Sequence, residues 1–382
     1  MKIAYFNANM KRGQDGVTRV IYKMIDAARE RGHQVMAVTS TLPDPEDRIV
    51  PMVQVPSIAL PLQKVYRVAF PCYQTFAKQL REFQPDILHI NSPCPLGFVA
   101  GVYARDFNIP AVATYHTHFP AYSRYYNLQG FEDLTWKIMK HFYNNVDRTF
   151  VPALPILEEL SVHDIHGLRY LPNGVDLTFF NPKNRSVDWR KGITSDTDKP
   201  IVLFVSRLVW EKDLTDLARM YNILKNKRND FEMVVIGDGY ARTEFEAMMP
   251  GAKFLGYQSG KTLAQSYASS DIFVFPSTTE TFGLVTVEAM ASGAVPVTAK
   301  IGGAVGIIQE GISGLFALPH DSADMAQEVE FLLDHPDRRA SMAAAALVRA
   351  QEFGWTKILN QLFEHYADVC DLHIYLQHRY VA

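Results

Sequence analysis

Along the first half of the chain, hydrophobic and polar positions follow the pattern of strands joined by helices. Residues 2–8 form a continuous apolar run, and residues 17–31 repeat apolar side chains at helical spacing before Gly32. A second apolar run follows at 34–39, so the pattern opens as strand, helix and strand. Such a unit predicts a parallel sheet with right-handed crossovers. Further strands are expected at residues 86–91, 111–117, 148–152 and 168–171.

The second half of the chain repeats the alternation more regularly. Because helical patterns separate these apolar runs as well, we expect a second parallel sheet and an α/β fold of two doubly wound domains. Residues 173–199 are rich in Lys, Arg, Asp, Ser and Thr and lack periodicity, which predicts a linker between the domains. The strands of the second domain are expected at residues 201–206, 233–237, 253–257, 272–275, 295–298 and 314–317.

Composition and charge narrow the classes of protein to consider. A chain of 382 residues is too long for one comfortable core, which agrees with two domains. The net charge is −3, so the chain as a whole is not a polyanion binder and local cations must carry any phosphate recognition. Three cysteines without a CxxC pair argue against a disulfide framework or a zinc site and fit a reducing cytosol. We expect no signal peptide and no membrane-spanning run.

The stretch from residue 273 to 292, FVFPSTTETFGLVTVEAMAS, combines a strand, a turn and a helix start. The free N–H groups and the dipole of a helix that begins at the carboxyl end of a parallel strand favour a phosphate there. Glu280 lies in the turn and Glu288 in the helix, where each carboxylate can accept hydrogen bonds from a pair of hydroxyls, one pair from a sugar and the other from a ribose. The ordinary alternative is that Glu280 is a solvated loop acid and Glu288 a capping or surface charge.

This stretch resembles the signature of the family 4 retaining glycosyltransferases. The similarity consists of two glutamates separated by seven residues, with Phe282-Gly283 between them and Ala-Met-Ala-Ser-Gly after them. It implies the B-type glycosyltransferase fold, in which two Rossmann-like domains face each other across a cleft. Residues 1–172 then form an acceptor-binding domain, completed by a final crossover helix at about 356–382, and residues 200–355 form the domain that binds the nucleotide-sugar donor.

Two cations follow the first strand of the second domain. Arg207 ends this strand and Lys212 lies five residues later, near a helix start, so both can reach one diphosphate. From the residues alone they can equally be two surface cations. The family has an arginine and a lysine at this spacing for the donor phosphates. Asp213 departs from the family, which usually has glycine there, so the turn after Lys212 is expected to differ.

Other positions take their roles from the same resemblance. Glu288 is expected to hold the ribose and Glu280 the sugar hydroxyls. The backbone N–H groups of residues 282–284 are expected to meet phosphate or sugar oxygens. His116, which leaves a strand end, resembles the active-site histidine that meets the donor sugar. Binding of the donor is assigned to Gly16, Gly237, Asp238, Phe282, Gly283, Leu284 and Glu288, and catalysis to His116, Arg207, Lys212 and Glu280.

Several of these positions also have ordinary interpretations. Gly13 and Gly16 do not form a GxGxxG pattern and on spacing alone indicate a plain turn. Asp238, between two glycines, is equally suited to cap the next helix. His116 and His118 alternate, but no carboxylate or cysteine accompanies them at the usual spacing, so a metal site is not expected. The aromatic run at Tyr122, Tyr125 and Tyr126, with Arg124, resembles the subset that transfers mannosyl, sulfoquinovosyl, glucuronosyl or related sugars to lipid acceptors.

The function implied is that of a retaining hexosyltransferase. It moves a mannose-, glucose- or glucuronate-type unit from a nucleotide-diphosphate sugar such as GDP-mannose or UDP-glucose to a lipid or glycan hydroxyl, forming an α-glycosidic bond. The family's proposed route is front-face, with the leaving phosphate helping to take the acceptor proton. No Asp-x-Asp motif is evident, so no metal or other cofactor is expected. Two alternatives stay open, a nucleotide-sugar 2-epimerase on the same scaffold and a non-catalytic nucleotide-sugar sensor.

The segment from residue 57 to 83 raises the question of membrane contact. Its interleaved basic and aromatic residues include Lys64, Tyr66 and Arg67, and such residues can lie on an anionic bilayer surface. They can also form an ordinary domain surface, and Pro71 argues against one continuous amphipathic helix. We therefore expect a cytoplasmic protein without nucleic-acid partners. Contact of this protein with the inner face of the cell membrane stays open.

Overall fold

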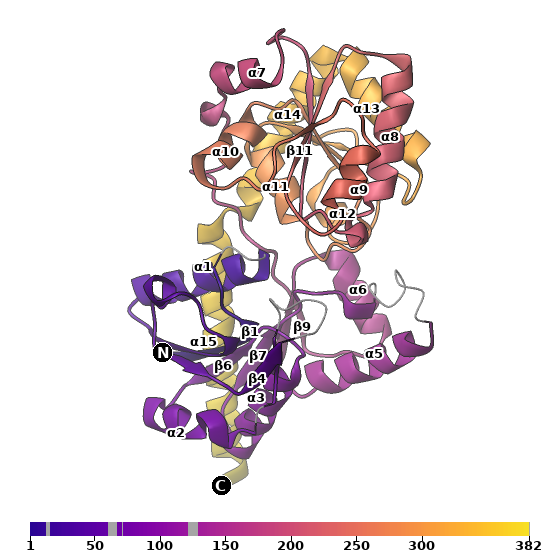
Figure 1. The fold of residues 1–382 in the computed structure, drawn as a ribbon. Coiled ribbons are helices and arrows are strands. Elements are labelled where there is room, and N and C mark those ends of the chain that lie inside the picture. Colours follow the sequence, from indigo (N-terminus) through magenta and orange to yellow (C-terminus); the bar gives the residue numbers. More distant parts are fainter. Residues whose placement is uncertain (13–15, 60–66, 71, 121–128, 382) are drawn as a thin grey trace. The chain divides into compact units, whose positions relative to one another are not determined.

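The chain folds into two compact units in a computed structural model (Figure 1). The structure describes residues 1–12, 16–59, 67–70, 72–120 and 129–381. The first unit consists of Met1–Pro172 and Ile358–Ala382, and the second of Asn173–Lys357. Each unit is an α/β layer structure with its own hydrophobic core.

The first unit is built on a seven-stranded parallel sheet in the order β3-β2-β1-β6-β7-β8-β9. Its central strands are buried on both faces, which explains why they are continuous apolar runs in the sequence. A short antiparallel pair of strands, which the sequence pattern did not reveal, is formed by β4 (Ser57–Ala59) and β5 (Arg67–Ala69). The strands of the sheet are β1 (Lys2–Asn9), β2 (Gln34–Thr41), β3 (Met52–Gln54), β6 (Ile87–Ile90), β7 (Ala111–Thr114), β8 (Arg148–Val151) and β9 (Leu168–Tyr170).

Helices cover both faces of this sheet (Figure 1). α1 and α15 share one face, where the rings of His33 and Phe363 lie 5.3 Å apart. Right-handed crossovers put the remaining helices on the other face. Gly32 follows the end of α1 with φ of 76°, as its position in the sequence predicted. The helices are α1 (Gly16–Glu30), α2 (Gln74–Phe83), α3 (Pro95–Asp106), α5 (Gln129–Tyr143), α6 (Leu154–Val162) and α15 (Trp355–Val381), with a 3-10 turn η1 (Pro45–Asp47).

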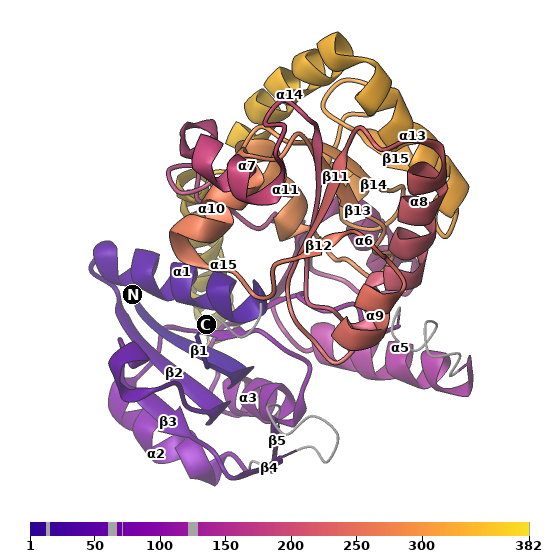
Figure 2. The same cartoon turned by 45° about the horizontal axis from the view of Figure 1, so that its top comes forward.

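The second unit is a six-stranded parallel sheet in the order β12-β11-β10-β13-β14-β15. Figure 2 shows α8, α9 and α13 on one side of it and α10, α11 and α14 on the other. Its strands are β10 (Ile201–Val205), β11 (Glu232–Ile236), β12 (Lys253–Phe254), β13 (Ile272–Phe275), β14 (Val295–Ala299) and β15 (Leu315–Ala317). Its helices are α7 (Val187–Ile193), α8 (Leu214–Lys227), α9 (Arg242–Ala247), α10 (Gly260–Ala268), α11 (Leu284–Ala291), α12 (Ala304–Ile307), α13 (Ser322–Asp334) and α14 (Pro336–Ala350), with 3-10 turns η2 (Pro182–Asn184), η3 (Trp210–Lys212) and η4 (Gln351–Phe353).

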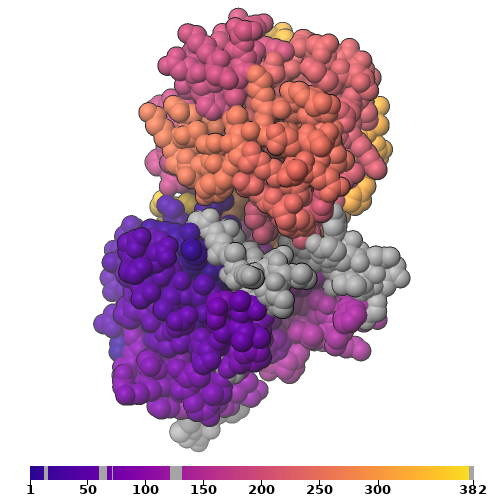
Figure 3. All heavy atoms as spheres, in the orientation of Figure 1, coloured from indigo at the N-terminus to yellow at the C-terminus, as the bar shows by residue number. Residues whose placement is uncertain are grey.

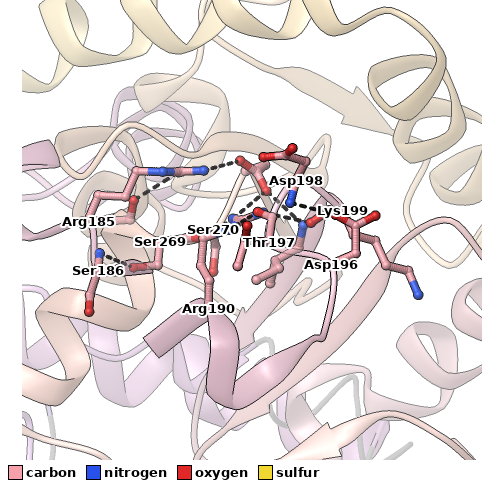
Figure 4. A network of polar contacts seen from close by, with 12 residues as sticks. Arg185, Ser186, Arg190, Asp196, Thr197, Asp198, Lys199, Ser269 and Ser270 are labelled. Atoms are coloured by element: carbon pink, nitrogen blue, oxygen red, sulfur yellow. Dashed lines mark hydrogen bonds and ion pairs between the residues drawn. The ribbon is translucent and has the colours of Figure 1, made fainter. Parts of the chain in front are cut away.

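The two doubly wound sheets confirm the predicted fold class, but residues 173–199 differ from the expected linker. They contain η2 and α7 and belong to the second unit. Arg190 on α7 is buried and donates to the carbonyl oxygens of Thr197 and Lys199, both at 2.7 Å, and to Asp271 at 3.0 Å (Figure 4). Figure 3 shows α7 as part of the continuous surface of this unit. The segment lacks periodicity because polar side chains rather than an apolar stripe hold it in place.

Two features bear on membrane contact. No helix in the described part of the chain is long and apolar enough to cross a bilayer. In the segment from 57 to 83, the side chains of Ile58 and Phe70 are 57% and 61% exposed, while Lys64, Tyr66 and Pro71 lie outside the described residues.

Candidate active site

The predicted site residues of the second unit follow strands that meet at one point of the sheet. The strand order reverses between β10 and β13, which are neighbours although β11 and β12 separate them in sequence. Ligands of open α/β sheets bind at the carboxyl ends of strands at such a switch point. Arg207 follows β10, and Glu280 follows β13, so the topology brings both to this edge. Gly237 and Asp238 follow β11, which is the other neighbour of β10.

Lys212 and Glu280 form a direct ion pair at the switch point. The side chain of Lys212 is 9% exposed and that of Glu280 is 23% exposed, so water screens the pair less than it would on an open surface. Arg207 is exposed and lies on the loop between β10 and η3, on the same connection as Lys212. Glu280 is therefore not a solvated loop acid, which was the alternative to a functional role, because it pairs with a buried cation.

Three consecutive residues after β10 contact three consecutive residues after β13. The carbonyl oxygen of Glu211 accepts a hydrogen bond of 2.9 Å from the Thr279 hydroxyl. Lys212 pairs with Glu280. Asp213 accepts hydrogen bonds at one carboxylate oxygen from both the backbone N–H of Thr278, at 2.7 Å, and its hydroxyl, at 2.9 Å. We call this set of contacts, between residues 211–213 and 278–280, the turn clamp.

Asp213 occupies a backbone conformation that explains its difference from glycine. Its φ is 53° and its ψ 41°, in the left-handed region that glycine adopts without strain and that aspartate tolerates better than most residues. Its side chain is buried, and burial raises the pKa of the carboxyl group, while the two hydrogen bonds from Thr278 oppose this shift. The turn after Lys212 therefore keeps the conformation that glycine favours and gains a carboxylate.

The start of α11 agrees with the sequence expectation. Gly283 stands before the helix with φ of 100°, a conformation that few other residues adopt. Phe282 is buried, with its ring 5.7 Å from that of Phe353, and Leu284 begins the helix half-buried. An 8-residue helix that begins at a strand end directs its first N–H groups toward the switch point.

Glu288 is not a surface charge. It lies inside α11, its side chain is buried, and one carboxylate oxygen accepts a hydrogen bond of 2.9 Å from the buried hydroxyl of Tyr267 on α10. A buried carboxylate is costly unless it is hydrogen-bonded, so this position calls for a structural or functional reason. Tyr267 was missed by sequence reasoning because 21 residues separate it from Glu288.

Gly237 and Asp238 have evident structural tasks. A Cβ atom at Gly237 would lie 1.7 Å from the carbonyl oxygen of Ser206, so close packing between two loops requires glycine there. Asp238 is exposed and accepts hydrogen bonds from the Gly239 N–H at 2.8 Å and from Arg242, in the first turn of α9, at 3.2 Å. The helix-capping alternative for Asp238 is wrong, because Ala241 is the N-cap of α9 and makes no side-chain cap hydrogen bond.

In the first unit, His116 lies just beyond the end of β7. Its Nε2 atom is 3.1 Å from the side-chain oxygen of Asn91, which follows β6, so Nε2 carries the proton in this contact. Burial lowers the pKa of His116 to about 3, which keeps the imidazole neutral at physiological pH. Gly16 is the first residue of α1, after β1. The order of this sheet reverses between β1 and β6, so Gly16 and Asn91 follow the two strands of its own switch point.

A buried polar network supports this region. The Nε2 atom of His89 is 2.7 Å from the Thr114 hydroxyl at the end of β7, and its Nδ1 atom contacts the hydroxyl of Tyr366 on α15. Burial lowers the pKa of His89 to about 3, with the nearby His116 as a second cause. The network was missed because 277 residues separate His89 from Tyr366.

His118 is held between two partners. Its Nδ1 atom is 2.7 Å from the Tyr115 hydroxyl and its Nε2 atom 3.1 Å from a carboxylate oxygen of Glu159. These contacts indicate a structural role for His118, separate from the role expected for His116. Gly13 and the aromatic run at 122–126 lie outside the described residues.

One group of side chains in the described part of the chain has metal-ligand geometry. Ligand atoms of Asp213, Asp216 and His320 lie within 4.8 Å of one another. In this structure the histidine pairs with the acids, since its Nδ1 atom is 3.1 Å from Asp216 and 3.8 Å from Asp213. Sequence reasoning missed the group because His320 lies 104 positions after Asp216.

Comparison with known proteins decides the family. One family model, Glycosyltransferase Family 4, matches residues 14–179, and another, Glycosyl transferases group 1, matches residues 186–349. A GDP-mannose-dependent alpha-mannosyltransferase of Corynebacterium glutamicum is 33% identical over 378 residues, which cover 97% of this chain and 90% of that protein. The chain belongs to the family 4 glycosyltransferases. It is thus a nucleotide-sugar-dependent hexosyltransferase, as the resemblance implied.

Two further comparisons place this glycosyltransferase more closely. It is similar to the sulfoquinovosyl transferase SQD2 of Arabidopsis thaliana, with 32% identity over 349 residues that cover 88% of this chain and 68% of that protein. Sucrose-phosphate synthase from Thermosynechococcus elongatus has the same fold, with a TM-score of 0.80 and 21% identity over 97% of this chain and 99% of that one. These relatives agree with the predicted B-type fold and with the predicted subset of the family.

Proposed function

We propose that this glycosyltransferase moves a hexosyl unit of mannose, glucose or glucuronate type from a nucleotide-diphosphate sugar to a hydroxyl of a lipid or glycan, with retention and an α-glycosidic product. The names of the relatives support this range, since one uses GDP-mannose and another transfers sulfoquinovose. The first unit would take the acceptor and the second the donor. The observation that carries the proposal is the Lys212–Glu280 pair at the switch point of the second unit.

We assign the donor's charge to two cations and its hydroxyls to two acids. Arg207 and Lys212 would hold the diphosphate, Arg207 through its planar fork and Lys212 as a point charge. Glu280 would then leave Lys212 and accept hydroxyl hydrogens of the sugar, and Glu288, held by Tyr267, would accept those of the ribose. The first N–H groups of α11, with those of Phe282 and Gly283, would meet phosphate or sugar oxygens. Gly237, Asp238 and Gly16 would shape the loops around the donor.

The reaction exchanges one bond to the anomeric carbon for another. The bond to the diphosphate oxygen breaks, the bond to the acceptor oxygen forms on the same face, and the acceptor proton passes to the leaving phosphate. The cations stabilise the charge that grows on the leaving group, which is the largest kind of catalytic contribution. His116, neutral because its pKa is low, would accept a hydrogen bond at Nδ1 from a hydroxyl of the transferring sugar without adding charge.

The proposed reaction needs no metal ion or other cofactor, because side chains and backbone N–H groups meet the phosphate charge. Removal of divalent ions should leave the transfer rate unchanged. The test measures transfer with and without excess chelator, in the parent protein and in H320A, since His320 belongs to the group with metal-ligand geometry. A rate that falls with chelator and returns with one added metal would contradict this part of the proposal.

A two-step experiment tests the function. A panel of nucleotide sugars is first screened by thermal shift, where a donor at 100 times its dissociation constant should add about 2.7 kcal/mol of stability. The donor found is then incubated with and without candidate acceptors, and the release of free nucleotide diphosphate is measured. Acceptor-dependent release supports transfer. Conversion of the sugar without an acceptor would indicate the 2-epimerase, and binding without turnover for every acceptor would indicate the sensor.

We also propose a cytoplasmic protein that contacts the inner face of the membrane through the β4–β5 side of the first unit. The exposed apolar side chains of Ile58 and Phe70 support this proposal, because such groups enter the headgroup region favourably. Lys78 and Arg81 on the adjoining helix α2 would face anionic headgroups. Sedimentation with anionic vesicles should capture the parent chain and less of I58S/F70S, and equal capture of both would exclude this surface.

A further inference from the structure

The turn clamp links the two assigned donor groups, Lys212 and Glu280, through residues that have no role in the proposed chemistry. Its middle contact is the ion pair itself. On either side stand the hydrogen bonds from Thr278 to Asp213 and from Thr279 to the Glu211 carbonyl. Asp213 and Thr279 are buried and Thr278 is half-buried, so these outer contacts are partly shielded from competing water.

Donor binding would affect the three contacts differently. A diphosphate is the stronger partner for Lys212, so the middle contact is exchanged when the donor arrives, and both side chains become free to change rotamer. The outer contacts involve no group that the donor needs. They can therefore keep residues 211–213 and 278–280 in register while the ion pair opens.

We propose that Asp213 is a positioning residue that holds the turn of Glu280 against the turn of Lys212 while the donor replaces their ion pair. This inference rests on the proposed function of Lys212 and Glu280. Asp213 is suited to the task because it lies next to Lys212 in sequence and because one of its carboxylate oxygens accepts both hydrogen bonds from Thr278. Its left-handed backbone conformation directs the side chain toward that turn instead of continuing the helix.

The test compares two aspartates that have the same backbone conformation. D213G removes the carboxylate while glycine tolerates φ of 53° at no cost, so the backbone of the turn is preserved. D164G makes the same exchange at φ of 56°, where the side chain is exposed and pairs with Lys140. Both variants lose an aspartate and relieve the same strain, so their difference reports the clamp.

We expect D213G to lower kcat/KM for the donor about 5-fold to 150-fold, the cost of leaving the two hydrogen-bond donors of Thr278 without their acceptor. The loss should include kcat, because a displaced Lys212 stabilises the leaving group less well. D164G should keep the parent values. D213N keeps an oxygen in place for Thr278 and should recover at least half of the loss on a logarithmic scale. T279V tests the other outer contact and should give a smaller loss.

Two results would overturn the proposal. One is a D213G enzyme whose kcat and donor KM equal those of D164G. The other is a D213G loss that disappears when assays are corrected for the folded fraction by circular dichroism, which would make the residue merely structural. K212A, assayed in parallel, separates this outcome from failure of the proposed function: if K212A keeps full transfer, the donor assignment itself is wrong.

Discussion

The two switch points of this glycosyltransferase differ in the charge of the side chains that follow their strands. In the second unit the strand ends carry charges, with the ion pair of Lys212 and Glu280 and the buried carboxylates of Asp213 and Glu288. In the first unit they carry neutral polar groups, since burial keeps His89 and His116 uncharged and Asn91 completes the set. The difference follows what each unit is proposed to bind, an anionic donor in one and a hydroxyl acceptor in the other.

The difference also shows in how each set is held. Charged groups at the second switch point are paired with one another, so a ligand must replace a partner before it binds. The neutral groups at the first are connected by hydrogen bonds from Tyr366 through His89 to Thr114, which no ligand has to break. Substitutions should therefore have unequal effects in the two units.

The largest effect is expected from the cations. R207A and K212A should each lower the transfer rate about 10²–10³-fold, because each removes a charge-assisted contact to the leaving group. The measurement is steady-state transfer at saturating donor. K227A removes a cation of the same unit that pairs with Glu330 on the surface, and it should keep the parent rate. A folded R207A enzyme with full activity would refute the phosphate assignment.

The next effect concerns stability. G237A should destabilise the second unit by about 3 kcal/mol, because its Cβ would meet the Ser206 carbonyl and its φ is 141°. Gly192, on α7, has open space around it, so G192A should stabilise by about 0.4–1 kcal/mol. Urea unfolding of both variants measures the difference. Equal stabilities would mean that the packing of the two loops does not require glycine at position 237, which would leave ligand binding as its role.

The neutral network of the first unit predicts a pH dependence of stability. The pKa of His89 is about 3 in the folded chain and about 6.5 when unfolded, so between these values only the unfolded chain binds the proton. Stability should therefore fall with decreasing pH below about 6.5, by about 1.4 kcal/mol per pH unit for this residue. In H89Q the free energy of unfolding should fall less steeply with decreasing pH, by the contribution of His89 alone. Identical slopes in both proteins would show that His89 is not held neutral.

The smallest effect is expected in catalysis by the first unit. Because the pKa of His116 lies near 3, the ratio of the parent rate to that of H116Q should stay constant between pH 5 and 8. Transfer assays across this range measure the ratio. A ratio that changes through about pH 6.5 would mean that His116 titrates during the reaction. The first switch point would then also carry a charge.

The comparison also explains what the sequence could predict. The central strands of both sheets were found because sheets covered on both faces need continuous apolar runs, as in β10 and β13, whereas the short strands β3, β4 and β5 were missed. The turn with Glu280 and Gly283 was found because a positive φ before a helix favours glycine. Interactions between distant residues gave no such pattern. Arg190 holds residues 173–199 to the second unit through polar contacts that have no period, and the turn clamp joins positions 65 to 68 residues apart. Asp213 stood out only as a departure from glycine.

The central claim is that the charged switch point of the second unit binds the donor diphosphate. A crystal structure of the protein with its donor, or with the nucleotide diphosphate alone, tests it most directly. The account predicts phosphate oxygens within hydrogen-bond distance of Arg207 and Lys212, with Glu280 turned away from Lys212 and the contacts of Asp213 with Thr278 intact. A diphosphate bound away from both cations, with the Lys212–Glu280 pair unbroken, would contradict it.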